Sequence, residues 1–242
     1  LPGEIPVTPG STSLGDYMTG MNGCIGIMMA LRHREETGKG QVVDCALFES
    51  VFRVLDEIAP RFAMDGFVRE PEGTGTVNAC PHGHFPSGDG KFLAIACTTD
   101  KMFERLTVAM QRPDLLEKFS DQAVRLGSRE EVLNEVEKWT LSMPRHNLIE
   151  ICTQSGVPAG AINSIADIFE DPHFGARKLL KKINVSKLGE VTVPNVIPGL
   201  SDSPGEVTKL GPSLGEDTIA LYQEELGLSK KELSELRENE VI

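Results

Sequence analysis

Residues 84–154 constrain the fold most strongly, because a hairpin signal in this stretch is followed directly by several helical patterns. A Gly-Asp-Gly turn at residues 88–90 separates two apolar runs, residues 84–87 and 91–97, and this arrangement predicts a β-hairpin. Apolar residues at helical spacing then predict three helices, at residues 99–111, 128–143 and 144–154. The sequence therefore predicts a small domain that combines a strand pair with a majority of helix.

Two local signals mark where the last two of these helices begin. Ser128 and Glu131 have the spacing of a capping box, which predicts that a helix starts at Ser128. Pro144 is expected in the first turn of the next helix. Its missing N–H costs no hydrogen bond there, because the N–H groups of a first turn have no acceptor within the helix.

The N-terminal stretch predicts one long helix that begins after Ser13 and ends at Gly38. Apolar residues recur at three- and four-residue steps from Met18 to Leu31, so we expect one face of this helix to be buried. Glycines interrupt the same stretch, at a cost of about 1 kcal/mol each relative to alanine. These glycines predict that another backbone or a ligand lies close to the helix. A second helix packed against it is the simplest interpretation.

Shorter elements complete the prediction. They comprise a strand at residues 41–45, a helix at 46–59 ended by Pro60, an extended segment at 157–161, a helical turn at 165–169, a strand pair at 179–185 and 191–196, a helix at 217–226 and a last helix capped by Ser229 and Glu232. Residues 2–10 are rich in proline and glycine and predict a connector entered from an upstream part of a longer protein.

Charge and cysteine content exclude several classes of protein. The 242 residues carry 36 acidic and 24 basic side chains, and the net charge of −12 repels nucleic-acid backbones and anionic lipid. We therefore predict neither nucleic-acid nor membrane binding. The longest apolar-rich stretch, residues 18–31, is shorter than the ~20 residues that a membrane span needs. Five cysteines without a CxxC pair predict reduced thiols and a cytoplasmic protein.

Residues 65–86 form the stretch most suited to a function, because they lose periodicity and gather glycine and proline. This stretch contains the run Cys-Pro-His-Gly-His at residues 80–84, which is the densest group of zinc-type ligands in the chain. No second Cys/His pair has metal spacing, so we predict no metal site. Contact with a substrate or with another backbone is the favoured interpretation of the run.

The sequence contains no known catalytic motif that would assign a reaction to this stretch. The Gly-Lys-Gly at residues 38–40 precedes a predicted strand, and no GxSxG or HExxH pattern occurs. Asp16 is most simply a carboxylate that complements the helix dipole in a first turn, with a catalytic role as the less favoured alternative. The residues alone indicate an α/β protein with a functional loop near residues 65–88.

Several stretches taken together resemble the class III CoA-transferase family, which includes formyl-CoA and carnitine CoA-transferases. The resemblance follows the family order along essentially the whole chain. It is carried by Ser-Leu-Gly-Asp at residues 13–16, Thr-Gly-Lys-Gly-Gln-Val-Val-Asp at 37–44, Gly-Asp-Gly-Lys-Phe-Leu-Ala-Ile at 88–95, Gly-Val-Pro-Ala-Gly-Ala-Ile-Asn at 156–163 and Leu-Gly-Pro-Ser-Leu-Gly-Glu at 210–216.

The resemblance implies that CoA moves between an acyl-CoA and a free carboxylic acid through an aspartyl anhydride and an enzyme thioester. That aspartate and most of the CoA-contacting basic residues of the family are expected upstream of Leu1, so no nucleophile is assigned here and this segment alone is expected to be inactive. The thioester of coenzyme A is then a substrate, and no permanently bound cofactor is expected. The implied partners are a second copy of the chain, as a homodimer, or the upstream portion.

The same resemblance implies an α/β fold with part of a parallel-sheet, Rossmann-like large domain, a small α+β domain and two interlocked chains. The expected divisions are residues 1–64 in the large domain, 65–84 as an active-site loop, 85–180 as the small domain and 181–242 returning to the large domain. Residues at the family's closing loop, which shields the reactive anhydride from water, are expected to contact substrate: Asn78, His82, Gly83 and His84.

Two alternatives remain open at this point. A 2-methylacyl-CoA racemase of the same superfamily would exchange an α-proton with histidine and acidic groups. An acidic residue would be expected after the hairpin strand in such an enzyme, whereas this chain has Cys97, Thr98 and Thr99 there. A non-catalytic scaffold or binding module is the other alternative, because the chain holds no complete catalytic constellation of its own.

Overall fold

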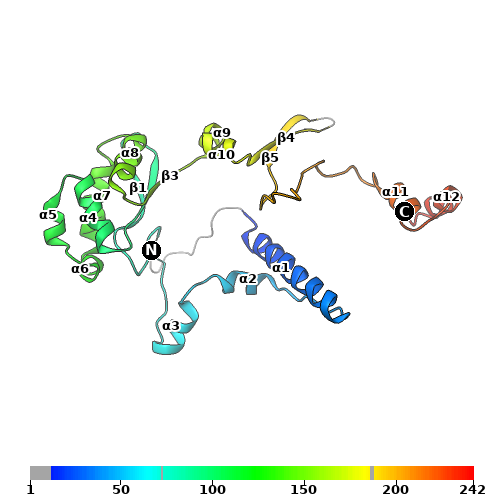
Figure 1. Cartoon of the computed structure of the whole chain (residues 1–242), viewed down its shortest axis with the longest axis horizontal. Helices are drawn as coiled ribbons and strands as arrows, with labels where there is room; N and C mark the ends of the chain where they lie inside the picture. The colour runs from blue at the N-terminus through cyan, green and yellow to red at the C-terminus, as the bar shows by residue number, and fades with distance from the viewer. Residues whose placement is uncertain (1–11, 72, 186–187) are drawn as a thin grey trace. The chain divides into compact units, whose positions relative to one another are not determined.

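The computed structural model describes residues 12–71, 73–185 and 188–242, and the connector predicted at residues 2–10 lies outside them. The chain divides into two compact units, Leu1–Ile162 and Asn163–Ile242. Helices and small antiparallel sheets make up both units, so the fold is a mixed α/β fold (Figure 1). None of the helices in the described ranges is long and apolar enough to cross a membrane.

The N-terminal helix α1, Leu14–Thr37, ends where the sequence predicts, because Gly38 adopts the left-handed conformation that terminates it. The predicted burial of one face is wrong, since none of the residues of α1 is buried. Close approach by another segment is confirmed at Gly26, where an added Cβ would lie 2.7 Å from Cγ1 of Val43. Gly20 and Gly23 have nothing within 4 Å of such a Cβ.

The stretch after α1 differs from the prediction in two ways. Residues 41–45 form no strand, since no neighbouring strand among the described residues offers them a ladder of hydrogen bonds. The helix predicted at residues 46–59 is divided into α2, Leu47–Arg53, and α3, Ile58–Asp65. Pro60 lies in the first turn of α3 instead of ending a helix. A proline is tolerated there, because the N–H groups of a first turn have no acceptor within the helix.

The predicted β-hairpin is confirmed. Strand β1, His82–Pro86, pairs antiparallel with β2, Phe92–Ala96, and β3, Ala159–Ile162, pairs antiparallel with the other edge of β2. Phe85 lies opposite Leu93, and both side chains are buried. The central strand of this sheet therefore contributes to the core on one face of the hairpin.

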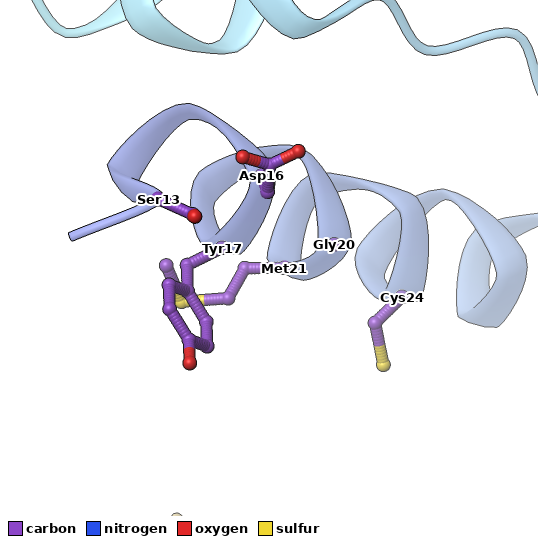
Figure 2. Close-up of a pocket in the computed structure, with 6 residues that line it drawn as sticks. All are labelled: Ser13, Asp16, Tyr17, Gly20, Met21 and Cys24. Atoms are coloured by element: carbon purple, nitrogen blue, oxygen red, sulfur yellow. The ribbon is translucent and has the colours of Figure 1, made fainter. Parts of the chain in front are cut away.

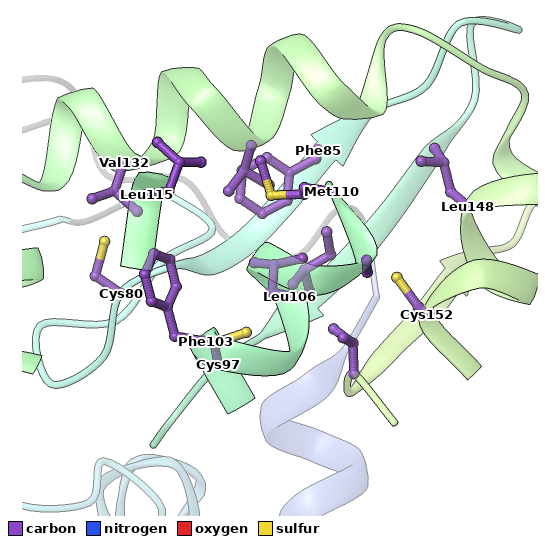
Figure 3. Packing of buried hydrophobic residues seen from close by; sticks show 14 of the residues in the cluster. Cys80, Phe85, Cys97, Phe103, Leu106, Met110, Leu115, Val132, Leu148 and Cys152 are labelled. Atoms are coloured by element: carbon purple, nitrogen blue, oxygen red, sulfur yellow. The ribbon is translucent and has the colours of Figure 1, made fainter. Parts of the chain in front are cut away.

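Five helices pack around this sheet: α4, Asp100–Ala109; α5, Pro113–Lys118; α6, Gln122–Gly127; α7, Arg129–Thr140; and α8, Arg145–Ser155. Their apolar faces converge on the hairpin. Figure 3 shows residues of this core cluster, with Phe85 beside Met110, and with Phe103 and Leu106 of α4, Val132 of α7 and Leu148 of α8. The first unit therefore has one contiguous hydrophobic core.

The capping signals of these helices have mixed outcomes. Thr99 caps α4 by accepting a hydrogen bond from the backbone N–H of Met102 at 3.3 Å. The capping box predicted at Ser128 does not form, because the φ of −115° and ψ of 29° of Ser128 are not the extended values that an N-cap needs. Pro144 precedes α8 as its N-cap residue, one position before the predicted first turn.

The second unit is built from smaller elements: α9, Ile165–Glu170; α10, Pro172–Ala176; β4, Leu180–Val185; β5, Gly189–Pro194; α11, Thr218–Glu224; and α12, Lys230–Glu238. The predicted strand pair is confirmed as an antiparallel β4–β5 ladder in which Ile183 is buried opposite Val191. The predicted capping box at Ser229 and Glu232 also forms. Leu233 is the buried residue of α12.

Truncation of Leu106 tests the core of the first unit. Leu106 is fully buried on α4, so Leu106→Ala is expected to lower the free energy of unfolding by about 2–5 kcal/mol. Val108 lies on the same helix and is 66% exposed, so Val108→Ala is the matched control and is expected to cost less than about 1 kcal/mol. Urea unfolding followed by circular dichroism measures both changes, and equal losses would contradict this core.

Candidate functional site

The four residues expected to contact substrate lie in two different kinds of structure. Asn78 belongs to the irregular segment before β1, whereas His82, Gly83 and His84 are the first three residues of that strand. The strand therefore begins two residues earlier than the sequence predicts. Strand pairing with Ala96, Ile95 and Ala94 gives these three residues fixed register positions that a loop would not have.

Alternation along β1 separates the environments of the strand residues. Gly83 and Phe85 lie on the buried face, and His84 on the other face is exposed. His82 is half-buried, and its Nδ1 atom is buried without a hydrogen-bond partner among the described residues. A buried polar atom without a partner costs about 1–3 kcal/mol, so His82 carries hydrogen-bonding capacity that the fold itself does not use.

Thr74 joins the irregular segment to the start of β1. Its Oγ1 accepts a hydrogen bond from the backbone N–H of His84 at 2.9 Å. A Cβ added at Gly83 would lie 3.2 Å from the same oxygen. Glycine at position 83 therefore leaves room for Thr74 to pack directly over the strand.

Asn78 takes part in a polar cluster with α3. Its Nδ2 donates to Oε1 of Glu57 at 3.5 Å, and Nη1 of Arg69 lies 3.6 Å from the same oxygen. A hydrogen bond from the backbone N–H of Glu57 is the main cause of a lowered pKa for this carboxyl, and Arg69, Asn78 and Arg61 lower it further. Glu57 is therefore ionised at neutral pH and holds the Asn78 side chain.

Side chains of α6 and α7 hold the backbone of the same segment. Arg125 donates from Nε to the carbonyl oxygen of Cys80 at 2.9 Å, and Gln122 donates from Nε2 to that of Asn78 at 2.7 Å. Arg129 reaches the carbonyl oxygens of Val77 and Ala79 at 3.3 and 3.5 Å. Sequence reasoning missed these residues, because an arginine in a short amphipathic helix ordinarily indicates a solvated face.

The buried thiols near this site are not activated nucleophiles. Burial raises the pKa of Cys97 to about 12 and that of Cys152 to about 11. Burial also raises the pKa of Cys80, although the charges of Arg129 and Arg125 act against it. A thiol must lose its proton to attack, so these three cysteines are unreactive at neutral pH.

A second candidate functional site lies on α1. A depression there is lined by Ser13, Asp16, Tyr17, Gly20, Met21 and Cys24, which all belong to α1 or its first flanking residue. Figure 2 shows Asp16 projecting away from the side on which Tyr17, Met21 and Cys24 gather. One helix alone cannot enclose a substrate, so this face does not form a site by itself. No group of three metal-ligating side chains occurs among residues 12–71, 73–185 and 188–242.

Comparison with known proteins assigns the chain to a family. Residues 2–218 match the model of CoA-transferase family III, and the chain therefore belongs to this family. It is 51% identical to the succinyl-CoA–L-malate CoA-transferase alpha subunit of Chloroflexus aurantiacus, over 100% of this chain and 57% of that protein. The beta subunit from the same organism is 48% identical over 100% of this chain and 61% of its own length.

A solved structure has a similar fold. A CaiB/BaiF family protein from Brucella suis superposes with a TM-score of 0.75 and 31% sequence identity, covering 92% of this chain and 58% of its own. The chain thus spans about three-fifths of the length of the relatives that it matches.

Thiol reactivity tests the environment of the buried cysteines. At pH 8, Cys80, Cys97 and Cys152 are expected to resist iodoacetamide in the folded protein and to react fully in guanidinium, as measured by mass spectrometry of tryptic peptides. Stability should also fall as the pH rises above about 9, because unfolded thiols then ionise while the folded thiols of Cys97 and Cys152 keep their protons up to about 12 and about 11. Rapid native labelling of Cys97 would contradict its burial.

Proposed function

We propose that this chain is part of a CoA-transferase that moves CoA from an acyl-CoA to a free carboxylic acid. The observation that carries this proposal is the 51% identity, over the whole chain, to a succinyl-CoA–L-malate CoA-transferase subunit. That relative's name supports succinyl-CoA as the donor and a hydroxylated dicarboxylic acid such as L-malate as the acceptor.

The proposed reaction exchanges acyl groups on an enzyme carboxylate. A carboxylate attacks the thioester carbonyl and releases the CoA thiolate, which leaves a mixed anhydride. The thiolate then attacks the enzyme-side carbonyl of the anhydride, which releases the donor acid and forms an enzyme thioester. The acceptor carboxylate attacks that thioester, which releases the CoA thiolate and gives a second anhydride. The thiolate then attacks the acceptor-side carbonyl, which forms the acceptor acyl-CoA and releases the enzyme carboxylate. We assign the nucleophile to no residue of this chain.

The proposed substrate contacts are Asn78, His82, Gly83 and His84. The unused hydrogen-bonding capacity of His82 and the exposure of His84 support this role, because both histidines lie on the same face of β1. The racemase alternative has less support, since the position after β2 is occupied by Cys97, a buried thiol with a pKa of about 12 that cannot exchange protons at neutral pH.

The proposed assembly contains a second chain, either another copy or a related subunit. Similar identities to an alpha and a beta subunit, 51% and 48%, support a related subunit as well as a homodimer. The apolar side chains that α1 exposes, such as Tyr17, Met21 and Met29, support a protein contact there. The parallel sheet, the interlocked arrangement, the divisions at residues 64, 84 and 180, and a cytoplasmic location belong to the same proposal.

Activity of the complete native assembly tests the function. Succinyl-CoA and L-malate are expected to yield malyl-CoA and succinate in equal amounts, measured by liquid chromatography. The double variant with His82→Ala and His84→Ala should lower transfer about 3- to 10-fold or shift acceptor preference, as loss of hydrogen bonds to substrate would do, while CoA affinity changes little. His146→Ala is the matched control, because His146 is exposed on α8. Wild-type rates in the double variant across several acids would contradict this site.

Asp16 provides a separate test of where the nucleophile lies. Asp16→Asn in the complete assembly is expected to keep thioester formation, because Asp16 occupies the first turn of α1 and complements the helix dipole. Mass spectrometry of the enzyme after reaction with succinyl-CoA measures the thioester. Complete loss of the thioester with an unchanged circular dichroism spectrum would place the nucleophile at Asp16.

A further inference from the structure

Four successive backbone carbonyls, from Val77 to Cys80, each accept a hydrogen bond from a side chain of α6 or α7. Gln122 holds one of them, Arg125 holds one and Arg129 holds two, at donor–acceptor distances between 2.7 and 3.5 Å. These three side chains are three and four residues apart in sequence. We name them the carbonyl clamp.

The central member of the clamp is a charge without solvent contact. Arg125 is fully buried, and its Nη2 forms an ion pair with Asp100 at 2.5 Å and donates to Oε1 of Gln122 at 2.9 Å. Its Nη1 donates to the carbonyl oxygen of Phe119 at 3.1 Å. The guanidinium also lies 4.6 Å from the ring centroid of Phe103. All three guanidinium nitrogens therefore have partners.

The pair with Asp100 adds little stability, because Arg125 loses its hydration on burial while the Asp100 side chain is 58% exposed and screened by water. The arrangement fixes the positions of the acceptor groups instead, because the planar guanidinium donates its hydrogen bonds in fixed directions. Arg125 connects the start of α4, the end of α5, the start of α6 and the Cys80 carbonyl. The position of residues 77–80 is thereby tied to three helices at once.

We propose that Gln122, Arg125 and Arg129 are positioning residues that hold residues 77–80 as a fixed wall of the acyl site. This inference rests on the proposed function. A fixed wall keeps His82 and His84 in place and keeps water from the anhydride and thioester intermediates, whose hydrolysis competes with transfer. It also differs from a mobile closing loop, because four consecutive carbonyls would have to exchange their partners for the segment to move.

Hydrogen exchange tests the clamp without any need for activity. Amide exchange is measured in the complete native assembly, in peptides that cover residues 77–84. It is expected to accelerate at least about 10-fold in Gln122→Ala and in Arg125→Met. Arg125→Lys keeps the positive charge, so its change is expected to be smaller. Arg112→Met is the matched control, because Arg112 pairs with Asp114 and Glu135 on the surface of the same unit and should leave these peptides unchanged. Unchanged exchange in Gln122→Ala, the variant least disruptive to folding, would overturn the clamp.

The ratio of hydrolysis to transfer tests positioning. With succinyl-CoA and L-malate, Gln122→Ala is expected to raise the ratio of free CoA to malyl-CoA at least about 3-fold, whereas Arg112→Met should leave it at the wild-type value. A residue that only stabilises the fold would change the amount of active enzyme and not this ratio. Faster exchange with an unchanged ratio would overturn the positioning role. Absence of CoA transfer to any acid in the wild type would overturn the proposed function, while the exchange measurement would still decide the clamp.

Discussion

The burial of the Arg125 guanidinium is the constraint on which the candidate site depends. A charged group in the interior must find a partner for each of its donors, and Arg125 finds them on α4, on the α5–α6 junction and on the segment that enters β1. The first residues of β1 consequently occupy a place set by helices far along the chain. This arrangement and the pairing with β2 together set the positions of His82 and His84.

The distribution of charge in this acidic chain also bears on the proposed function. The arginines nearest the candidate site are engaged within the chain: Arg125 and Arg129 bind backbone carbonyls, and Arg69 lies beside Glu57. A CoA molecule carries several phosphates, which need cations that are still able to bind them. This distribution supports the expectation that most of the CoA-contacting basic residues lie in other parts of the proposed assembly.

Local signals predicted the elements whose causes lie within a few residues. The hairpin around residues 88–90, the end of α1 at Gly38 and the cap of α12 at Ser229 follow from turn, left-handed and capping preferences, and all three are present. The missing cap at Ser128 is also a local matter, because its φ of −115° and ψ of 29° are not the extended values of an N-cap, whereas Asp171, which likewise joins two helices, is extended and caps α10. The family resemblance was likewise readable, since its motifs are contiguous.

The sequence by itself therefore determined the hairpin, most helix boundaries, the acidic character and the family. Tertiary structure alone decided that Arg125 is buried, that His82 and His84 differ in exposure, and that residues 77–80 are held by α6 and α7. The physical reason is sequence distance. Arg125 and the Cys80 carbonyl are 45 residues apart, and no local preference of an arginine in a six-residue helix reveals which distant backbone group it will reach.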